Sequence, residues 1–185
     1  KLLIIIRNQK DILLSWYLDD IKYGYSINFN DWFKYICQTK KINKIKYHFM
    51  IEKYVNLLGI NKLKVIQFED LFNDNSSELF KFFDTNLDDY EFFKKNKKQY
   101  ENKRLNSSIN TNNYRMFKFV NSISTGKNNI KPGILYKVAK KIHFNEILPG
   151  KRINYEFLKI NLKELNLILD DLFKHDNIKV SELIN

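Results

Sequence analysis

The stretch "LIIIRNQKDILLSW", residues 3–16, carries the pattern that decides the fold. Residues 2–6 are short, β-branched and apolar throughout, which is typical of a strand buried on both faces of a parallel sheet. Asn8 is a predicted N-cap, and Asp11 falls three residues later, where the helix dipole favours a carboxylate. We therefore predict a strand over 2–6 and a helix from there to about Tyr23.

Strands and helices alternate through the rest of the first half of the chain. This pattern predicts an α/β fold, helix-rich, with a parallel β-sheet flanked by helices, in a single domain over residues 1–185. Residues 94–133 are instead polar and basic and show no long period. The predicted elements are a helix from Asn30 or Asp31, a helix over 46–58 ended by Gly59, a strand over 63–68, a helix over 76–87 capped by Ser76 or Ser77, and a helix over 161–184.

Arg7 follows the first predicted strand directly. Ligands of open α/β sheets bind at the C-terminal ends of the strands, and the next helix presents free backbone N–H groups there. The guanidinium is a planar fork of donors suited to phosphate, and Ser15, under two turns into the helix, adds a hydroxyl. The residues alone leave a second interpretation open, in which Arg7 pairs with Asp11 or Asp19 and Ser15 only packs.

The net charge of the chain is +11, and it has two interpretations. Most basic residues are scattered lysines, which together with abundant Asn and Ile indicate codon bias. The alternative is attraction to an anion, such as nucleic acid, a phosphorylated nucleotide or an acidic glycan. A lysine-rich run over 94–104, with Tyr100 inside it, supports a nucleic-acid partner, although no recognised nucleic-acid motif is present.

Cysteine and histidine usage favours a reducing compartment without a metal centre. Cys37 is the single cysteine of the chain, so no internal disulfide can form, and we expect a cytoplasmic protein. The three histidines, His48, His143 and His175, have no metal-ligand spacing with Cys37 or with each other. The longest apolar run is far too short to span a bilayer, and no signal peptide is recognised, so no transmembrane segment is expected.

Other residues have ordinary structural explanations. His48 falls on an amphipathic helix, where packing or a surface position is the expected role. Glu69 and Asp70 follow the second strand, and we expect them to cap a helix or to form an ion pair. Trp16 and Trp32 are expected in the core or in a crevice wall.

The segment "RNQKDILLS", 7–15, resembles the 3′-phosphate-binding segment of sulfotransferases that use 3′-phosphoadenosine 5′-phosphosulfate. In that family a strand is followed by Arg-Asn/Asp-Pro-x-Asp, apolar residues and then Ser, with the same Arg-to-Ser spacing. Here Gln9 replaces the proline, which loses a favoured first-turn residue but no ligand contact. The resemblance implies a P-loop-like sulfotransferase fold, in which Arg7 and Ser15 hold the 3′-phosphate of the nucleotide.

Further stretches resemble the family in the same order. "LKVIQFEDL", 63–71, is similar to a later strand with a "YEDL" ending, and 76–87 resembles the helix that follows it. "NKRLNSS", 102–108, resembles a segment that closes over the nucleotide, which implies three further nucleotide ligands. Residues 173–184 are similar to a C-terminal ending of bacterial sulfotransferases. The three implied ligands are Arg104, Asn106 and Ser107, and the residues alone leave open that Arg104 is a solvated loop residue.

The chain departs from the family pattern at its N-terminus. The family holds the 5′-phosphosulfate in a strand–loop–helix that precedes the Arg…Ser strand, and this sequence has no such segment. "STGKNN", 124–129, lacks the leading Gly and the Ser/Thr after Lys of a phosphate loop, and we interpret it as a turn. The resemblance thus covers the C-terminal two-thirds of a sulfotransferase, incomplete at the N-terminus, and the catalytic base is expected upstream of Lys1.

The resemblance implies transfer of a sulfonate from the nucleotide donor to a hydroxyl or amine, without a metal. The acceptor is unknown and is a glycan, a lipid or a small molecule, with a surface glycan among the expected partners. Two alternatives stay open: a basic, mostly helical nucleic-acid-binding module, and a non-catalytic member of the sulfotransferase fold that serves as a partner subunit.

Overall fold

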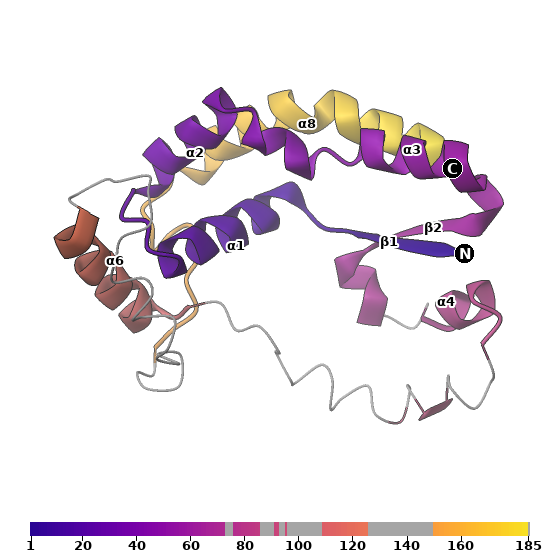
Figure 1. Cartoon of the computed structure of the whole chain (residues 1–185), viewed down its shortest axis with the longest axis horizontal. Helices are drawn as coiled ribbons and strands as arrows, with labels where there is room; N and C mark the ends of the chain where they lie inside the picture. The colour runs from indigo at the N-terminus through magenta and orange to yellow at the C-terminus, as the bar shows by residue number, and fades with distance from the viewer. Residues whose placement is uncertain (73–75, 86–90, 93–94, 96–108, 126–149, 185) are drawn as a thin grey trace. The chain divides into compact units, whose positions relative to one another are not determined.

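Figure 1 shows the computed structural model of the chain, in which two compact units are described separately. Unit 1 comprises Lys1–Asn8, Ile45–Asn106 and Asp171–Asn185, and unit 2 comprises Gln9–Lys44 and Ser107–Asp170. The chain is of the α/β class, helix-rich with a small parallel sheet. That it forms one domain stays a prediction. The structure describes residues 1–72, 76–85, 91–92, 95, 109–125 and 150–184.

The sheet of unit 1 pairs β1 (Leu2–Ile6) with β2 (Leu63–Gln67) in parallel. The predicted first strand is confirmed, and the second ends one residue early because Phe68 opens a 3₁₀ helix, η3 (Phe68–Phe72). The expectation that β1 is buried on both faces is wrong. Ile4 is buried, but Ile5, whose side chain points to the opposite face of the sheet, is 45% exposed. Within the described residues the sheet has only two strands.

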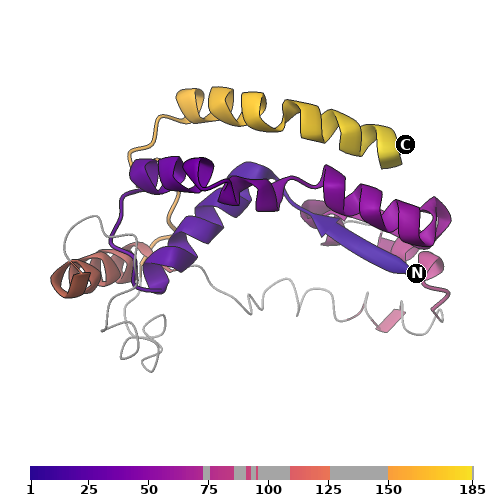
Figure 2. The same ribbon diagram turned by 45° about the horizontal axis from the view of Figure 1, so that its top comes forward.

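The other elements of unit 1 are α3 (His48–Leu58), the short η2 (Ile60–Lys62), α4 (Ser76–Phe82) and the C-terminal half of α8 (Leu162–Ile184). Gly59 ends α3 as predicted: its φ is +79°, and its N–H donates to the carbonyl of Val55. Figure 2 shows the C-terminal half of α8 beside α3.

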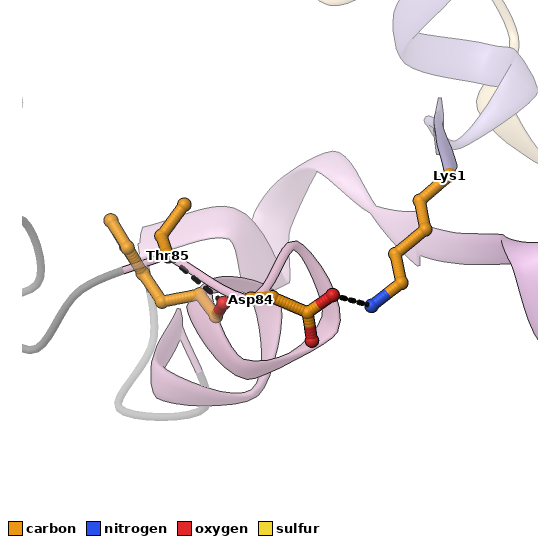
Figure 3. A network of polar contacts seen from close by, with 4 residues as sticks. Lys1, Asp84 and Thr85 are labelled. Atoms are coloured by element: carbon orange, nitrogen blue, oxygen red, sulfur yellow. Dashed lines mark hydrogen bonds and ion pairs between the residues drawn. The ribbon is translucent and has the colours of Figure 1, made fainter.

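Helix α4 begins at Ser76 itself, so neither predicted cap residue precedes the helix. It ends at Phe82, earlier than predicted, and the chain then turns through Asp84 at a positive φ of 54°. Lys1 reaches this turn, where its ammonium pairs with the Asp84 carboxylate (Figure 3). The Thr85 hydroxyl donates to the carbonyl of Phe80, which closes the end of the helix.

Unit 2 is built from α1 (Gln9–Lys22), α2 (Phe29–Gln38), α6 (Thr111–Thr125), the first part of α8 and all but the last residue of η1 (Lys41–Ile45). Helix α1 ends where predicted, and Gly24 follows it at a φ of +99°. Helix α2 begins at Phe29, one or two residues before the predicted start. The reason is Asn28, whose Oδ1 accepts the Asp31 N–H at 2.9 Å.

An aromatic cluster, comprising Tyr17, Phe29, Trp32 and Tyr155, forms the core of unit 2. Its rings meet edge to face, with Tyr17 5.3 Å from Phe29 and 5.4 Å from Trp32 between centroids. Both Tyr17 and Trp32 are fully buried. The Trp32 Nε1–H donates to Asp20 Oδ2 at 2.7 Å, so the one polar atom of that ring is satisfied.

Helix α6 lies inside the segment 94–133, where the sequence shows no long period and no helix is predicted. The helix turns polar residues inward, because Asn113 and Asn121 are both buried. The Asn121 side-chain amide donates to the carbonyls of Ile21 and Tyr25, which ties α6 to the end of α1. Asparagines at core positions interrupt the apolar period that would have revealed the helix.

Candidate anion-binding site

Arg7 occupies the position directly after β1, as the sequence predicted. Its backbone is held by one phenol: the Tyr47 hydroxyl donates to the Arg7 carbonyl at 2.8 Å and accepts the Arg7 N–H at 3.2 Å. Burial raises the pKa of Tyr47, so the phenol stays protonated and keeps its donor. The end of the strand is therefore fixed at both polar groups of one residue.

The guanidinium of Arg7 lies against η3. Its Cζ is 5.1 Å from the centroid of the Phe68 ring, which is a cation–π distance. Its Nε is 3.6 Å from Glu69 Oε1, close enough for an ion pair but too long for a hydrogen bond. The expected ion pair of Glu69 is thus confirmed, and its partner is Arg7. The second interpretation of the sequence predicts Asp11 or Asp19 as the partner of Arg7 instead.

The Arg7 Nε is buried, and no acceptor lies within hydrogen-bond distance among the described residues. The side chain as a whole is 32% exposed, so part of it is accessible from solvent. A buried N–H without an acceptor costs free energy that an incoming oxyanion would recover. An arginine with a fixed backbone, a ring against its face and an unused donor can bind phosphate or a similar oxyanion.

The other predicted nucleotide ligands are placed as follows. Ser15 lies on α1 in unit 2 and is exposed, which does not support the interpretation that it only packs. Arg7 belongs to unit 1, so Arg7 and Ser15 are described in different units. Arg104, Asn106 and Ser107 lie outside the described residues. Of "STGKNN", the first two residues end α6, and the remainder also lies outside them.

Ordinary packing surrounds His48, Cys37 and the two tryptophans, whereas His143 lies outside the described residues. His48 is buried at the start of α3 with its ring against Phe49. Burial raises the pKa of the Cys37 thiol, which makes it a poor nucleophile. Trp16 meets the core residue Trp32 edge to face. The described residues contain no group of His, Cys, Asp or Glu side chains arranged to hold a metal ion.

Sequence reasoning missed three residues around Arg7. The sequence predicts Tyr47 inside an amphipathic helix, but it precedes α3 and contacts the end of β1. Phe68 falls in the second predicted strand, but it opens η3 against the guanidinium. Asp176 falls in the last predicted helix, where nothing in the sequence indicates that it accepts the backbone N–H groups of Tyr47 and His48. Of these three residues, only Phe68 is indicated by the sequence, because it stands in place of the tyrosine in the family's "YEDL" ending.

Comparisons with models of known protein families, with curated proteins and with solved structures find no match for this chain. Within the described residues, no helix has the length and apolar character needed to cross a membrane.

Proposed function

We propose that this chain is a sulfotransferase that binds 3′-phosphoadenosine 5′-phosphosulfate, with Arg7 as a ligand of the nucleotide's 3′-phosphate. The observation that carries the proposal is the state of Arg7, whose Nε is buried without an acceptor at the end of a parallel strand. The resemblance of residues 7–15 to the 3′-phosphate-binding segment supplies the nucleotide. Ser15 on α1 and, further along, Arg104, Asn106 and Ser107 remain proposed ligands.

The proposed reaction is an in-line displacement at sulfur. The oxygen or nitrogen of the acceptor attacks the sulfonate, the bond between sulfur and the bridging phosphate oxygen breaks, and adenosine 3′,5′-bisphosphate leaves. The acceptor's proton passes to a base, which we do not assign to a residue of this chain. The role assigned here to Arg7 is to bind and orient the donor through a phosphate that does not react.

The acceptor in this proposal is a hydroxyl or an amine, with a surface glycan among the candidates. A cytoplasmic location is also part of the proposal, in line with the half-buried Cys37 thiol and the absence of a second cysteine. A metal ion has no step in the proposed reaction.

The proposal is tested by a competition titration at low and at physiological salt. We expect adenosine 3′,5′-bisphosphate to bind the purified protein at both salt concentrations, and adenosine 5′-phosphate to compete poorly, because only the first carries the 3′-phosphate. Equal binding of the two nucleotides would overturn the proposal. Tight binding of duplex DNA that survives physiological salt would instead support the nucleic-acid alternative, since many lysines would then displace counterions together.

A further inference from the structure

The backbone of Arg7 depends on a residue that belongs to a different element. Tyr47 lies in the connection before α3, only 9% of it is exposed, and its hydroxyl contacts both the carbonyl and the N–H of Arg7. One phenol thus closes two hydrogen bonds with one residue. Because these bonds fix the peptide groups on either side of the Arg7 Cα, they also fix the direction in which its side chain leaves the strand.

Tyr47 in turn is held by the C-terminal helix. Asp176 on α8 is 7% exposed, and its Oδ2 accepts the Tyr47 N–H at 2.8 Å while its Oδ1 accepts the His48 N–H at 3.3 Å. Tyr47, the cap residue of α3, makes no side-chain capping bond, so this carboxylate satisfies the free N–H groups of the helix start from another helix.

These contacts form a continuous path within unit 1, from Asp176 through Tyr47 to Arg7. Phe68 and Glu69 contact the far end of the arginine side chain, at 5.1 Å and 3.6 Å. Arg7 is thus held at its guanidinium by η3 and at its backbone by Tyr47. Removing the Tyr47 hydroxyl leaves the contacts of the guanidinium in place but frees the backbone that carries the side chain.

We propose that Tyr47 and Asp176 are positioning residues that hold Arg7 in the orientation required to bind an anionic phosphate. The proposal rests on the proposed role of Arg7 as a ligand of the 3′-phosphate. It makes Asp176 on α8 act on the binding site through Tyr47. The 3′-phosphate preference, defined as the affinity for adenosine 3′,5′-bisphosphate divided by that for adenosine 5′-phosphate, measures this positioning.

Tyr47→Phe is the first test, because it keeps the buried ring and removes only the hydroxyl. We expect the 3′-phosphate preference to fall about fivefold, because both hydrogen bonds that fix the backbone of Arg7 are lost. Asp176→Asn keeps the shape of the carboxylate and should lower the preference in the same direction. Tyr54→Phe, which removes a hydroxyl from an exposed tyrosine of α3, is the matched control and should change nothing.

A purely structural role would give a different result. It would lower the affinities for both nucleotides together and leave the 3′-phosphate preference unchanged, which would overturn the proposal. In an Arg7→Ala background, Tyr47→Phe should have no further effect on the preference, since the side chain that it positions is gone. A Tyr47→Phe protein that no longer folds would also count against positioning, because it would assign the hydroxyl to stability.

A second measurement needs no nucleotide and separates this proposal from the proposed function. The chain has only four arginines, so the Nε–H signal of Arg7 in a nitrogen–proton NMR spectrum can be assigned by its loss in Arg7→Lys. We expect hydrogen exchange at this N–H to accelerate in Tyr47→Phe and Asp176→Asn but not in Tyr54→Phe. Unchanged exchange in both variants would overturn the positioning role, whereas wild type without a 3′-phosphate preference would overturn the proposed function alone.

Discussion

Two half-buried cations, Lys118 in unit 2 and Arg7 in unit 1, differ in what their donors face. The Lys118 ammonium donates to the backbone carbonyls of Ser26 and Ile27, so it closes the loop that follows α1. The Arg7 guanidinium has a buried Nε with no acceptor in the part of the chain that is described. A cation whose donors end on its own unit stabilises that unit, whereas a cation with an unused donor retains the capacity to bind an anion.

The same contrast extends to the surroundings of the two cations. Near Lys118, the Tyr17 hydroxyl donates to the Ile27 carbonyl at 3.0 Å and shares a hydrogen bond with the Tyr114 hydroxyl at 2.9 Å, so polar groups satisfy one another. Around Arg7, the Tyr47 hydroxyl bonds only to the backbone, and the guanidinium contacts the Phe68 ring and lies at ion-pair distance from the Glu69 carboxylate. We therefore expect changes in the core of unit 2 and around Lys118 to act on stability, and changes around Arg7 to act on binding.

The largest effect is expected at Trp32, in the aromatic cluster of unit 2. Trp32→Ala should lower the free energy of unfolding by about 3–5 kcal/mol, because it leaves a cavity in a fully buried site and removes the donor to Asp20. Urea denaturation measures this change, and Trp16→Ala, at a half-buried ring, is the control with a smaller loss. A folded Trp32→Phe protein that lost the 3′-phosphate preference as fully as an Arg7 variant would contradict the contrast between the units.

The next effect is expected at Arg7, and it should appear in binding. Arg7→Ala should weaken the binding of adenosine 3′,5′-bisphosphate by about 1.5–3 kcal/mol, or roughly tenfold or more, since a charged contact with phosphate is lost. Calorimetric titration measures the affinity, and the free energy of unfolding should change little. Ser15→Ala should cost less, because a neutral donor is lost. Equal binding by wild type and Arg7→Ala would remove Arg7 from the site.

A third effect concerns the pH dependence of stability through Lys118. Burial lowers the pKa of this ammonium from its usual 10.5 to about 8. Between these values the unfolded chain binds more protons than the folded one, so stability should rise as the pH increases from about 8 to about 10.5, and this contribution should be flat below 8.

The measurement for Lys118 is urea denaturation at several pH values, with Lys118→Met compared with wild type. Lys34→Met, at an exposed lysine of α2, is the control that removes the same charge. The advantage of wild type over Lys118→Met should grow with pH above 8, and the advantage over Lys34→Met should not. A constant difference from Lys118→Met would show that the carbonyls of Ser26 and Ile27 hold the ammonium charged throughout.

Local patterns and the parallel sheet were predicted from the sequence, and side-chain contacts between distant segments were not. The end of α3 at Gly59 and the position of Arg7 after β1 depend on neighbouring residues, and both are confirmed. The parallel pairing of β1 with β2 is also confirmed, and it was predicted from the order of strands and helices. The contact of Tyr47 with Asp176 joins residues 129 positions apart, and no periodicity in either segment records it. The residues that close the site from a distance could therefore not be predicted from one sequence.

Helix α6 shows a different reason for a missed prediction. Its buried positions include Asn113 and Asn121, which a hydropathy pattern counts as solvent-facing. Its N-terminus is marked by Asn110, whose Oδ1 accepts the Asn113 N–H at 2.9 Å, and an asparagine cap is common in loops as well. Polar residues used as core hydrogen-bond donors conceal the helix until the carbonyls that they contact are known.

The smallest expected effect is at Glu69, and its sign decides how the site around Arg7 works. The Glu69 carboxylate is 3.6 Å from the Arg7 Nε, and its side chain is 47% exposed, so the pair itself contributes little to stability. A phosphate that approaches the guanidinium must compete with this carboxylate and is repelled by it. Glu69→Gln should therefore strengthen the binding of adenosine 3′,5′-bisphosphate by about 0.2–1 kcal/mol, or up to roughly fivefold.

Asp70→Asn, at the adjacent exposed carboxylate, changes the net charge equally, so any gain that it shares with Glu69→Gln comes from long-range charge alone. If Glu69→Gln weakens binding while Asp70→Asn does not, Glu69 orients the guanidinium and does not compete with the phosphate for it. The Glu69 carboxylate would then hold the Arg7 Nε–H in position for the ligand.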